Sequence, residues 1–169
     1  DPFLGSAMAA ARVKGFQGKN ILEYGSLLAC VKHFAAYGGA EAGRDYNTVD
    51  MSERTLREIY LPPYKAAIDA GAWTVMSAFN EIGGVPSSAS HWLMTDLLRK
   101  EWNFKGLVVS DYTAIMELMN HRIAKDTTEA GIIGLSYGVE IDMDSRIYVR
   151  KLADAVRTKK LSEEIVNEA

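Results

Sequence analysis

The chain has 169 residues, enough for one domain with a real core, and its 48% hydrophobic and 24% charged residues are typical of a globular protein. Its 19 basic and 22 acidic residues give a formal net charge of −3, without a long run of Lys or Arg. Nucleic acid and anionic membranes are therefore not expected as partners. No apolar stretch is long enough to span a bilayer. The single cysteine, Cys30, excludes an intrachain disulfide and is expected to be a small buried residue within an apolar run.

Both ends of the sequence indicate a segment of a longer polypeptide. The chain opens on Asp1-Pro2-Phe3 without an initiator methionine, and it stops at Asn167-Glu168-Ala169 within a helical pattern. No signal peptide is visible, but a segment can lack one that its parent carries. The sequence itself therefore does not indicate a compartment.

The first half of the chain predicts helices alternating with short apolar strands. In order, we expect a helix over Leu4–Phe16, a strand over Leu27–Phe34, a polar glycine-rich loop over Gly38–Val49, and a helix capped by Asp50-Met51-Ser52-Glu53 that Pro62-Pro63 interrupts before a second segment runs to Asp69.

The second half repeats the same alternation. We expect a strand over Trp73–Ala78, a loop over Phe79–Ala89, a helix over Ser90–Trp102, a strand over Gly106–Ser110, a helix over Tyr112–His121, a helix capped by Asp126-Thr127-Thr128-Glu129 running to Tyr137, a strand over Gly138–Ile141, and helices over Arg146–Lys159 and Ser162–Ala169.

This order predicts an α/β fold of four parallel βα units with no hairpin. Four units cannot close an eight-stranded barrel, so residues 1–169 form either half of a TIM-type (β/α)8 barrel, as a single partial domain, or an open sheet. In both, the loops after the carboxyl ends of the strands carry the chemistry. The polar residues Lys32-His33, Asp111 and Asp142 fall at these positions.

Asp111 directly follows the strand residues Leu107-Val108-Val109-Ser110, so its carboxylate would stand at the rim of the sheet. A carboxylate there could attack an anomeric carbon, act as a base or bind a metal. It could equally cap the helix predicted over Tyr112–His121, because Asp is a favoured N-cap residue. The pattern alone does not separate these interpretations.

Lys32 and His33 end a buried apolar strand, where an unpaired charge would be costly, so they favour a role in binding sugar hydroxyls or phosphate over a structural one. Arg44 in the long loop is a weaker candidate for clamping a substrate carboxylate, since such an Arg more often ties its own loop through an Asp. His91 and His121 are expected to be structural. Zinc-ligand spacing, phosphate-binding glycine patterns and a serine nucleophile elbow are absent, so no metal or cofactor is expected.

Several segments resemble a known family. The run Leu97-Leu98-Arg99-Lys100-Glu101-Trp102, followed by Gly106 and then by Leu107-Val108-Val109-Ser110-Asp111-Tyr112-Thr113-Ala114, resembles the active-site signature of family 3 glycoside hydrolases. Further segments resemble the bacterial periplasmic β-glucosidase branch: Val31-Lys32-His33-Phe34-Ala35-Ala36-Tyr37-Gly38, Arg44-Asp45-Tyr46-Asn47-Thr48-Val49-Asp50-Met51-Ser52, Pro62-Pro63-Tyr64-Lys65, Val75-Met76-Ser77-Ala78-Phe79-Asn80 and Gly84-Val85-Pro86. The likeness covers essentially the whole chain in unbroken order.

The resemblance implies the C-terminal half of the catalytic barrel of a retaining exo-β-glycosidase that hydrolyses β-glucosides or β-linked oligosaccharides. Asp111 matches the family nucleophile, and Lys32 and His33 match the pair that binds the nonreducing-end sugar. The acid/base Glu is expected outside this chain, in a second domain. Ala78 and Arg122 depart from the family pattern, at positions where Tyr and Gly respectively occur in other members. A periplasmic or secreted location is suggested by the resemblance only.

Two alternatives stay open. One is a β-xylosidase of the same family, whereas an N-acetylhexosaminidase is disfavoured because the loop lacks the Asp/His pair expected after a Lys-His-Phe-Pro-Gly run. The other is a noncatalytic half-barrel that folds or self-associates through exposed sheet edges, or that is complemented by the rest of the polypeptide.

Overall fold

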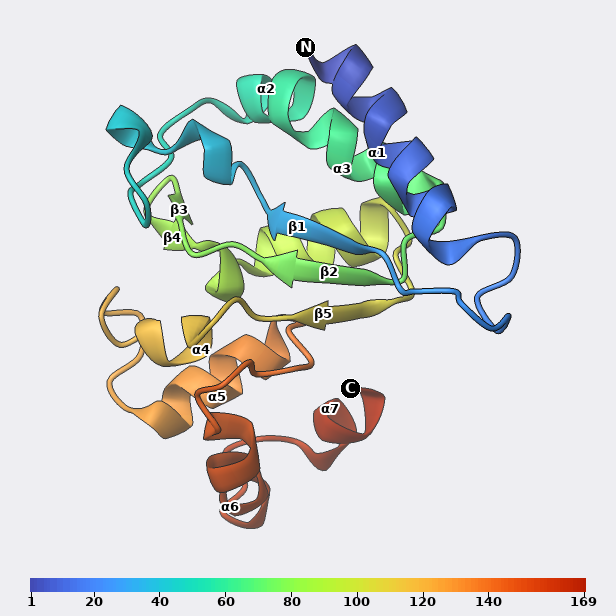
Figure 1. Ribbon diagram of the computed structural model, residues 1–169. Coiled ribbons are helices and arrows are strands. Elements are labelled where there is room, and N and C mark those ends of the chain that lie inside the picture. The colour runs from blue at the N-terminus through green and yellow to red at the C-terminus, as the bar shows by residue number, and fades with distance from the viewer.

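A parallel three-stranded sheet forms the centre of the protein. The computed structural model describes residues 1–169 and orders the strands β1 (Cys30–Phe34), β2 (Thr74–Ser77) and β5 (Leu107–Val109), all parallel (Figure 1). Val31, Val75 and Val108 align across the three strands, and all are buried. Buried apolar residues on parallel strands need helices on their faces, which the connections between the strands supply. The predicted α/β class with parallel βα units is confirmed.

The fourth predicted strand is reduced to one bridge. Ile141 pairs in parallel with Val109, and the backbone N–H groups of Glu140 and Ile141 donate to the carbonyl of Val108. The Glu140 carboxylate accepts from the N–H of Val108 at 2.7 Å, so a side chain occupies a backbone donor that a longer ladder would use. The segment lies where the sequence predicts a fourth strand, but the prediction of a regular strand over Gly138–Ile141 is wrong.

The chain stays helical through Pro62-Pro63, so the predicted interruption is wrong, but the predicted second segment with a proline in its first turn and its end at Asp69 is confirmed as α3. Helix α2 (Glu53–Thr55), a π-helical segment (Leu56–Tyr60) and α3 (Leu61–Asp69) follow one another with helical dihedral angles, φ −93° at Tyr60 and φ −74° at Leu61. A proline removes one N–H donor and crowds the carbonyl of the preceding turn, and a wider π turn relieves that crowding. Helix α1 (Pro2–Gln17) packs alongside α3 (Figure 1).

A β-hairpin follows β2, so the prediction of a fold without hairpins is wrong. Strand β3 (Glu81–Ile82) pairs in antiparallel fashion with β4 (Val85–Pro86). The turn residues Gly83 and Gly84 have φ values of 59° and 82°, and two positive φ angles are what a two-residue hairpin turn requires. The Gly-Gly pair was therefore a readable hairpin signal.

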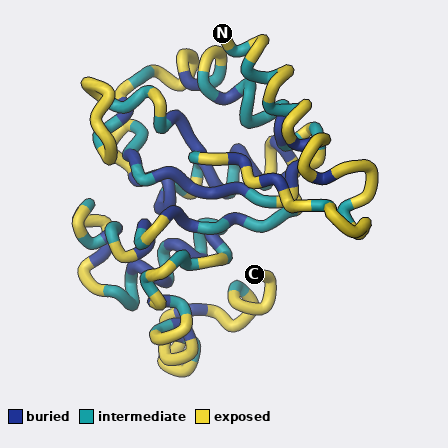
Figure 2. The backbone as a smooth tube through the Cα atoms, viewed as in Figure 1, coloured by how far each residue is buried: buried dark blue, intermediate teal, exposed yellow.

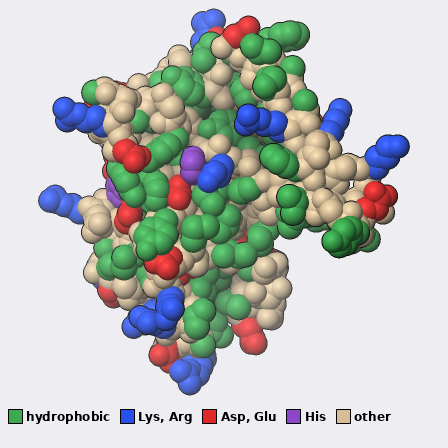
Figure 3. Space-filling model, viewed as in Figure 1, with side chains coloured by type: hydrophobic (Ala, Val, Ile, Leu, Met, Phe, Trp, Pro, Cys, Tyr) green, Lys and Arg blue, Asp and Glu red, His purple; other side chains and the backbone are tan.

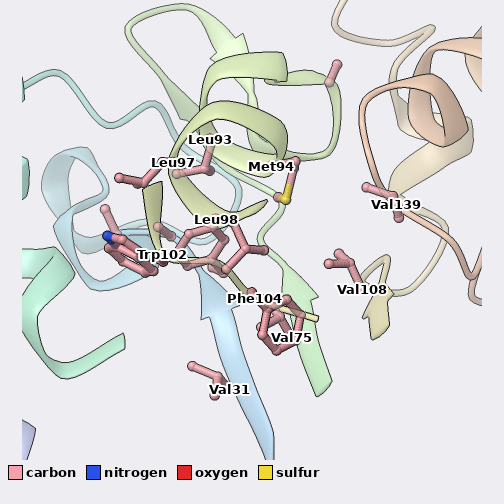
Figure 4. Packing of buried hydrophobic residues seen from close by; sticks show 14 of the residues in the cluster. Val31, Val75, Leu93, Met94, Leu97, Leu98, Trp102, Phe104, Val108 and Val139 are labelled. Carbon is pink, nitrogen blue, oxygen red and sulfur yellow. The ribbon is translucent and has the colours of Figure 1, made fainter. Parts of the chain in front are cut away.

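The core lies between the sheet and a π-helical segment, Trp92–Glu101, that contributes one apolar face. Figure 4 shows its side chains meeting the sheet valines together with Trp102 and Phe104. The remaining helices are α4 (Ala114–Glu117), α5 (Thr127–Ser136), a π-helical turn (Tyr148–Leu152), α6 (Ala153–Arg157) and α7 (Glu163–Glu168). The central strands are mostly buried while α1, α6 and α7 present exposed residues (Figure 2). No helix combines the length and apolar character needed to cross a membrane.

Cys30 is exposed, which corrects the expectation that it is buried. It lies on β1, an edge strand of the sheet, and alternate residues of a strand face opposite sides. Cys30 and Lys32 are exposed while Val31 between them is buried. Both exposed residues line a groove of about 590 Å³ between β1 and the helices α1 and α3.

A partly buried ion pair joins three parts of the core. Arg99 donates to the Glu140 carboxylate at 2.6 Å and to the carbonyls of Gly106 at 2.6 Å and Phe104 at 3.2 Å. The two side chains are 23% and 16% exposed, and burial raises the pKa of Glu140 even though Arg99 opposes that shift. Arg99 thus links the Trp92–Glu101 helix to the start of β5 and to the fourth-strand segment.

Replacement of Arg99 by Met is expected to destabilise the protein by about 2–4 kcal/mol, because it leaves the Glu140 carboxylate partly buried without its cation. Urea denaturation of the variant checks this. The matched control is Arg57→Met, since Arg57 pairs with Glu101 at 2.8 Å in a more exposed site and its loss is expected to cost about 1 kcal/mol or less. Equal losses in the two variants would contradict the structural role of the Arg99–Glu140 pair.

Candidate active site

The carboxyl ends of β1, β2 and β5 point to the same edge of the sheet, and the loops that follow them gather there (Figure 1). These loops are residues 35–49 after β1, the segment with the β3–β4 hairpin after β2, and the turn leading into α4 after β5. Three connections far apart in the sequence thereby share one rim.

Asp111 lies at this rim, just after β5. The residue is 9% exposed, and its Oδ1 accepts from the N–H of Tyr112 at 2.7 Å. Its Oδ2 is 3.4 Å from Nε2 of His33. Helix α4 starts only at Ala114, and its N-cap is Thr113, which makes no side-chain cap bond. The interpretation of Asp111 as a helix N-cap is therefore wrong, as is the long helix predicted over Tyr112–His121.

Ser110 bonds to the backbone of Asp111, and no pattern in the sequence singled it out. It is fully buried, its hydroxyl donates to the carbonyl of Asp111 at 2.9 Å, and its Oγ accepts from the N–H of Met143 at 2.9 Å. The Ser110 N–H also donates to the Ile141 carbonyl at 2.8 Å. One serine thus fastens the end of β5 to the fourth-strand segment, which limits movement of the carboxylate.

His33 is half-buried at the end of β1, with a side chain that is 30% exposed. Its carbonyl accepts from the hydroxyl of Tyr64 at 2.7 Å, and burial raises the pKa of that tyrosine to about 12. The neighbouring Lys32 is exposed and forms no ion pair, and it faces the groove beside α1. The structure therefore brings His33 to Asp111 but not Lys32.

A row of aromatic rings, Tyr37, Phe79 and Tyr46, extends from His33 and is called the aromatic wall below. The sequence alone did not predict this row. The ring centroids of His33 and Tyr37 are 5.4 Å apart, those of Tyr37 and Phe79 are 6.3 Å apart, and those of Phe79 and Tyr46 are 4.3 Å apart. Tyr46 remains 46% exposed. Partial burial raises its pKa, with further contributions from the negative charges of Glu117, Asp45 and Asp111.

The other candidates do not join Asp111. Arg44 is exposed and makes no side-chain bond, so the expected tie of its loop through that arginine is wrong; the Tyr37 hydroxyl donates to Asp45 instead. Asp142 accepts from the N–H groups of Ile147 at 2.7 Å and Tyr148 at 3.2 Å, which makes it a cap for the following helix.

The two remaining histidines are both paired with carboxylates. Nδ1 of His91 is 3.1 Å from Asp96, and Nδ1 of His121 is 2.7 Å from Glu81.

Figure 3 shows a histidine, basic and acidic side chains and hydrophobic side chains side by side near the middle of the face of the molecule that is in view.

A strand-end carboxylate beside a histidine and a row of aromatic rings is suited to binding a sugar ring and attacking its anomeric carbon. The sequence profile of the family described as "Glycosyl hydrolase family 3 N terminal domain" matches residues 1–169. The chain belongs to glycoside hydrolase family 3.

Relatives from this family share much of the sequence. The periplasmic beta-glucosidase of Salmonella typhimurium is 44% identical over 162 residues, which cover 96% of this chain and 21% of that protein. A beta-xylosidase of Formosa agariphila is 41% identical over 147 residues, covering 85% of this chain and 20% of that protein. The chain thus spans about a fifth of the length of these family 3 proteins.

Solved structures of the family share the fold. The beta-glucosidase of Listeria innocua in complex with glucose superposes with a TM-score of 0.97 at 45% identity, covering 99% of this chain and 24% of that one. A mutant of the same enzyme in complex with laminaribiose gives a TM-score of 0.97 at 44% identity, with the same coverage. The fold of this chain is therefore that of part of a family 3 N-terminal domain.

Proposed function

We propose that the polypeptide carrying this chain is a retaining exo-β-glucosidase and that Asp111 is its nucleophile. The observation that carries the proposal is the carboxylate at the end of β5, which caps no helix and places one oxygen 3.4 Å from His33. The other oxygen accepts from the N–H of Tyr112, a bond that a neutral Asn could also make, so the negative charge is not needed for it. The similarity to family 3 β-glucosidases supports the same assignment.

In the proposed reaction, an Asp111 oxygen bonds to the anomeric carbon as the bond from that carbon to the leaving oxygen breaks. A separate carboxylic acid gives its proton to the departing oxygen. In the second step, the conjugate base of that acid takes a proton from water, the water oxygen bonds to the anomeric carbon, and Asp111 leaves as a carboxylate. Two inversions at one carbon retain its configuration.

Lys32, His33 and Arg44 are proposed as substrate-binding residues, with different support. His33 contacts Asp111 and can donate to a hydroxyl of the sugar bound there. Lys32 and Arg44 are exposed in this chain and would have to turn toward the sugar. The position of each charge on a loop or strand end at the same rim is consistent with that role.

We also propose that residues 1–169 are the C-terminal half of a catalytic barrel, completed by other parts of the polypeptide. The free outer edge of β1 and the groove beside it are where further strands would pair. The proton donor is proposed to lie outside this chain as well. The isolated chain is accordingly not expected to hydrolyse cellobiose at ordinary enzyme rates, because a poor leaving group needs that acid.

A mechanism-based label tests the assignment. The complete polypeptide is incubated with a 2-deoxy-2-fluoro-β-glucosyl fluoride, digested and analysed by mass spectrometry. Modification of Asp111 is the expected result, and modification of Asp45 or Asp142 instead would refute the nucleophile. The corresponding xylosyl fluoride distinguishes a β-glucosidase from a β-xylosidase, the activity named for another relative. Faster labelling by the xylosyl reagent than by the glucosyl reagent would indicate a β-xylosidase.

A further inference from the structure

Glu81 connects all three loops of the candidate site. Its Oε2 accepts from the hydroxyl of Thr48 at 3.1 Å, in the loop after β1. Its Oε1 is 2.7 Å from Nδ1 of His121, in the turn after α4. Glu81 itself begins the hairpin after β2. One carboxylate therefore meets partners from the other two βα units.

The contacts between the first two loops form a continuous interface with one register. Tyr46 stacks on Phe79 at 4.3 Å, Thr48 bonds to Glu81, and Val49 forms a bridge with Ile82. Backbone bonds reinforce this register, since the Val49 N–H donates to the Glu81 carbonyl at 2.8 Å and the Gly83 N–H donates to the Val49 carbonyl at 3.1 Å. The exposed ring of Tyr46 is thus positioned by the same interface that contains Glu81.

The Glu81 side chain is shielded, which strengthens its bonds. It is 24% exposed, and that of His121 is 19% exposed. Hydrogen bonds to a charged group in a poorly solvated place contribute more than those at an open surface, where water competes. By contrast, the Arg54–Glu58 pair on α2 and the segment after it has side chains that are 83% and 58% exposed.

We propose that Glu81 is a positioning residue of this enzyme. By holding Thr48 and His121, it fixes the loop of residues 37–49 against the hairpin and the segment after Asp111. It thereby sets the place of Tyr37 beside His33 and of Tyr46 against Phe79. Glu81 does not touch the reacting atoms, so its effect reaches the sugar through the aromatic wall. The inference rests on the proposed glycosidase function, because its kinetic consequence requires that this rim binds the substrate.

The test compares three variants of the complete polypeptide on an aryl β-glucoside. Glu81→Ala is expected to lower kcat/KM roughly ten- to hundredfold, chiefly by raising KM, because one or two shielded hydrogen bonds to a charged group are lost. Glu81→Gln is expected to restore most of this, since its carbonyl can accept from Thr48 and its amide can donate to His121. Glu58→Ala, which removes an exposed carboxylate far from the rim, is the control and should match the wild type.

Hydrogen exchange supplies a readout that does not depend on substrate. Peptides covering residues 37–49 and 118–124 should exchange faster in Glu81→Ala, and Glu81→Gln should reverse the effect. If Glu81→Ala does not fold, Thr48→Val and His121→Phe each remove one partner and should each show a smaller increase in KM. An active wild type with unchanged kinetics in Glu81→Ala, or in both single-partner variants, would overturn the positioning role alone. An inactive wild type would overturn the proposed glycosidase function instead.

Discussion

Replacement of Asp111 by Ala or Asn in the complete polypeptide is expected to reduce kcat on the order of 10⁴-fold or more, as losses of nucleophiles do in other enzymes. Without a carboxylate at the end of β5, no covalent glycosyl intermediate can form. The free energy of unfolding should change by only about 1 kcal/mol or less, because Asp111 caps no helix and its contact with His33 is partly exposed. Steady-state kinetics and urea denaturation measure the two quantities.

Asp142→Ala is the matched control for this substitution. Both aspartates follow apolar segments at the same rim, yet Asp142 accepts two backbone N–H groups at the start of a helix. Its loss is expected to cost about 1 kcal/mol of stability and to leave turnover in place. If the two variants showed the reverse pattern, with turnover lost only in Asp142→Ala, the nucleophile would have to be reassigned.

The second large effect is expected at the end of β1. Replacement of Lys32 by Met and of His33 by Phe should each weaken transition-state binding by about 2–4 kcal/mol and lower kcat/KM accordingly. The reason is that hydrogen bonds from donors to sugar hydroxyls strengthen as the oxocarbenium-like state forms. His33→Phe keeps an aromatic ring beside Tyr37 and removes only the nitrogens, one of which lies 3.4 Å from Asp111. Kinetics on an aryl β-glucoside measure the loss.

His91→Phe serves as the control for this pair, since His91 is an exposed histidine paired with Asp96 on the side of the Trp92–Glu101 helix. It should keep the wild-type kcat/KM. Wild-type kcat/KM in both Lys32→Met and His33→Phe would mean that the two residues serve structure only.

Local sequence determined the framework of this protein. Short apolar runs such as the one at Val75 alternate with longer amphipathic segments, and this period predicts parallel βα units without knowledge of any contact. The same pattern placed Asp111 and His33 at strand ends, because the carboxyl ends of parallel strands share one edge. The β3–β4 hairpin is equally local, because the adjacent pair Gly83-Gly84 by itself predicts a two-residue hairpin turn.

Other features depended on neighbours that periodicity does not reveal. The fourth strand shrank to one bridge because the Glu140 carboxylate takes the N–H of Val108. Cys30 is exposed because it lines the groove between β1 and the helices α1 and α3, which the apolar run around it does not indicate. The helix through Pro62-Pro63 persisted because a π turn relieves the crowding.

The candidate site shows the same division. The sequence supplied the residue types and their places on strand ends, whereas the 3.4 Å approach of His33 to Asp111, the aromatic wall and the three-loop contact of Glu81 exist only in the folded chain. Strand periodicity reports which face a residue occupies, since backbone geometry fixes that locally. Distances between loops depend instead on how separate βα units pack, and that is decided by side chains far apart in the sequence.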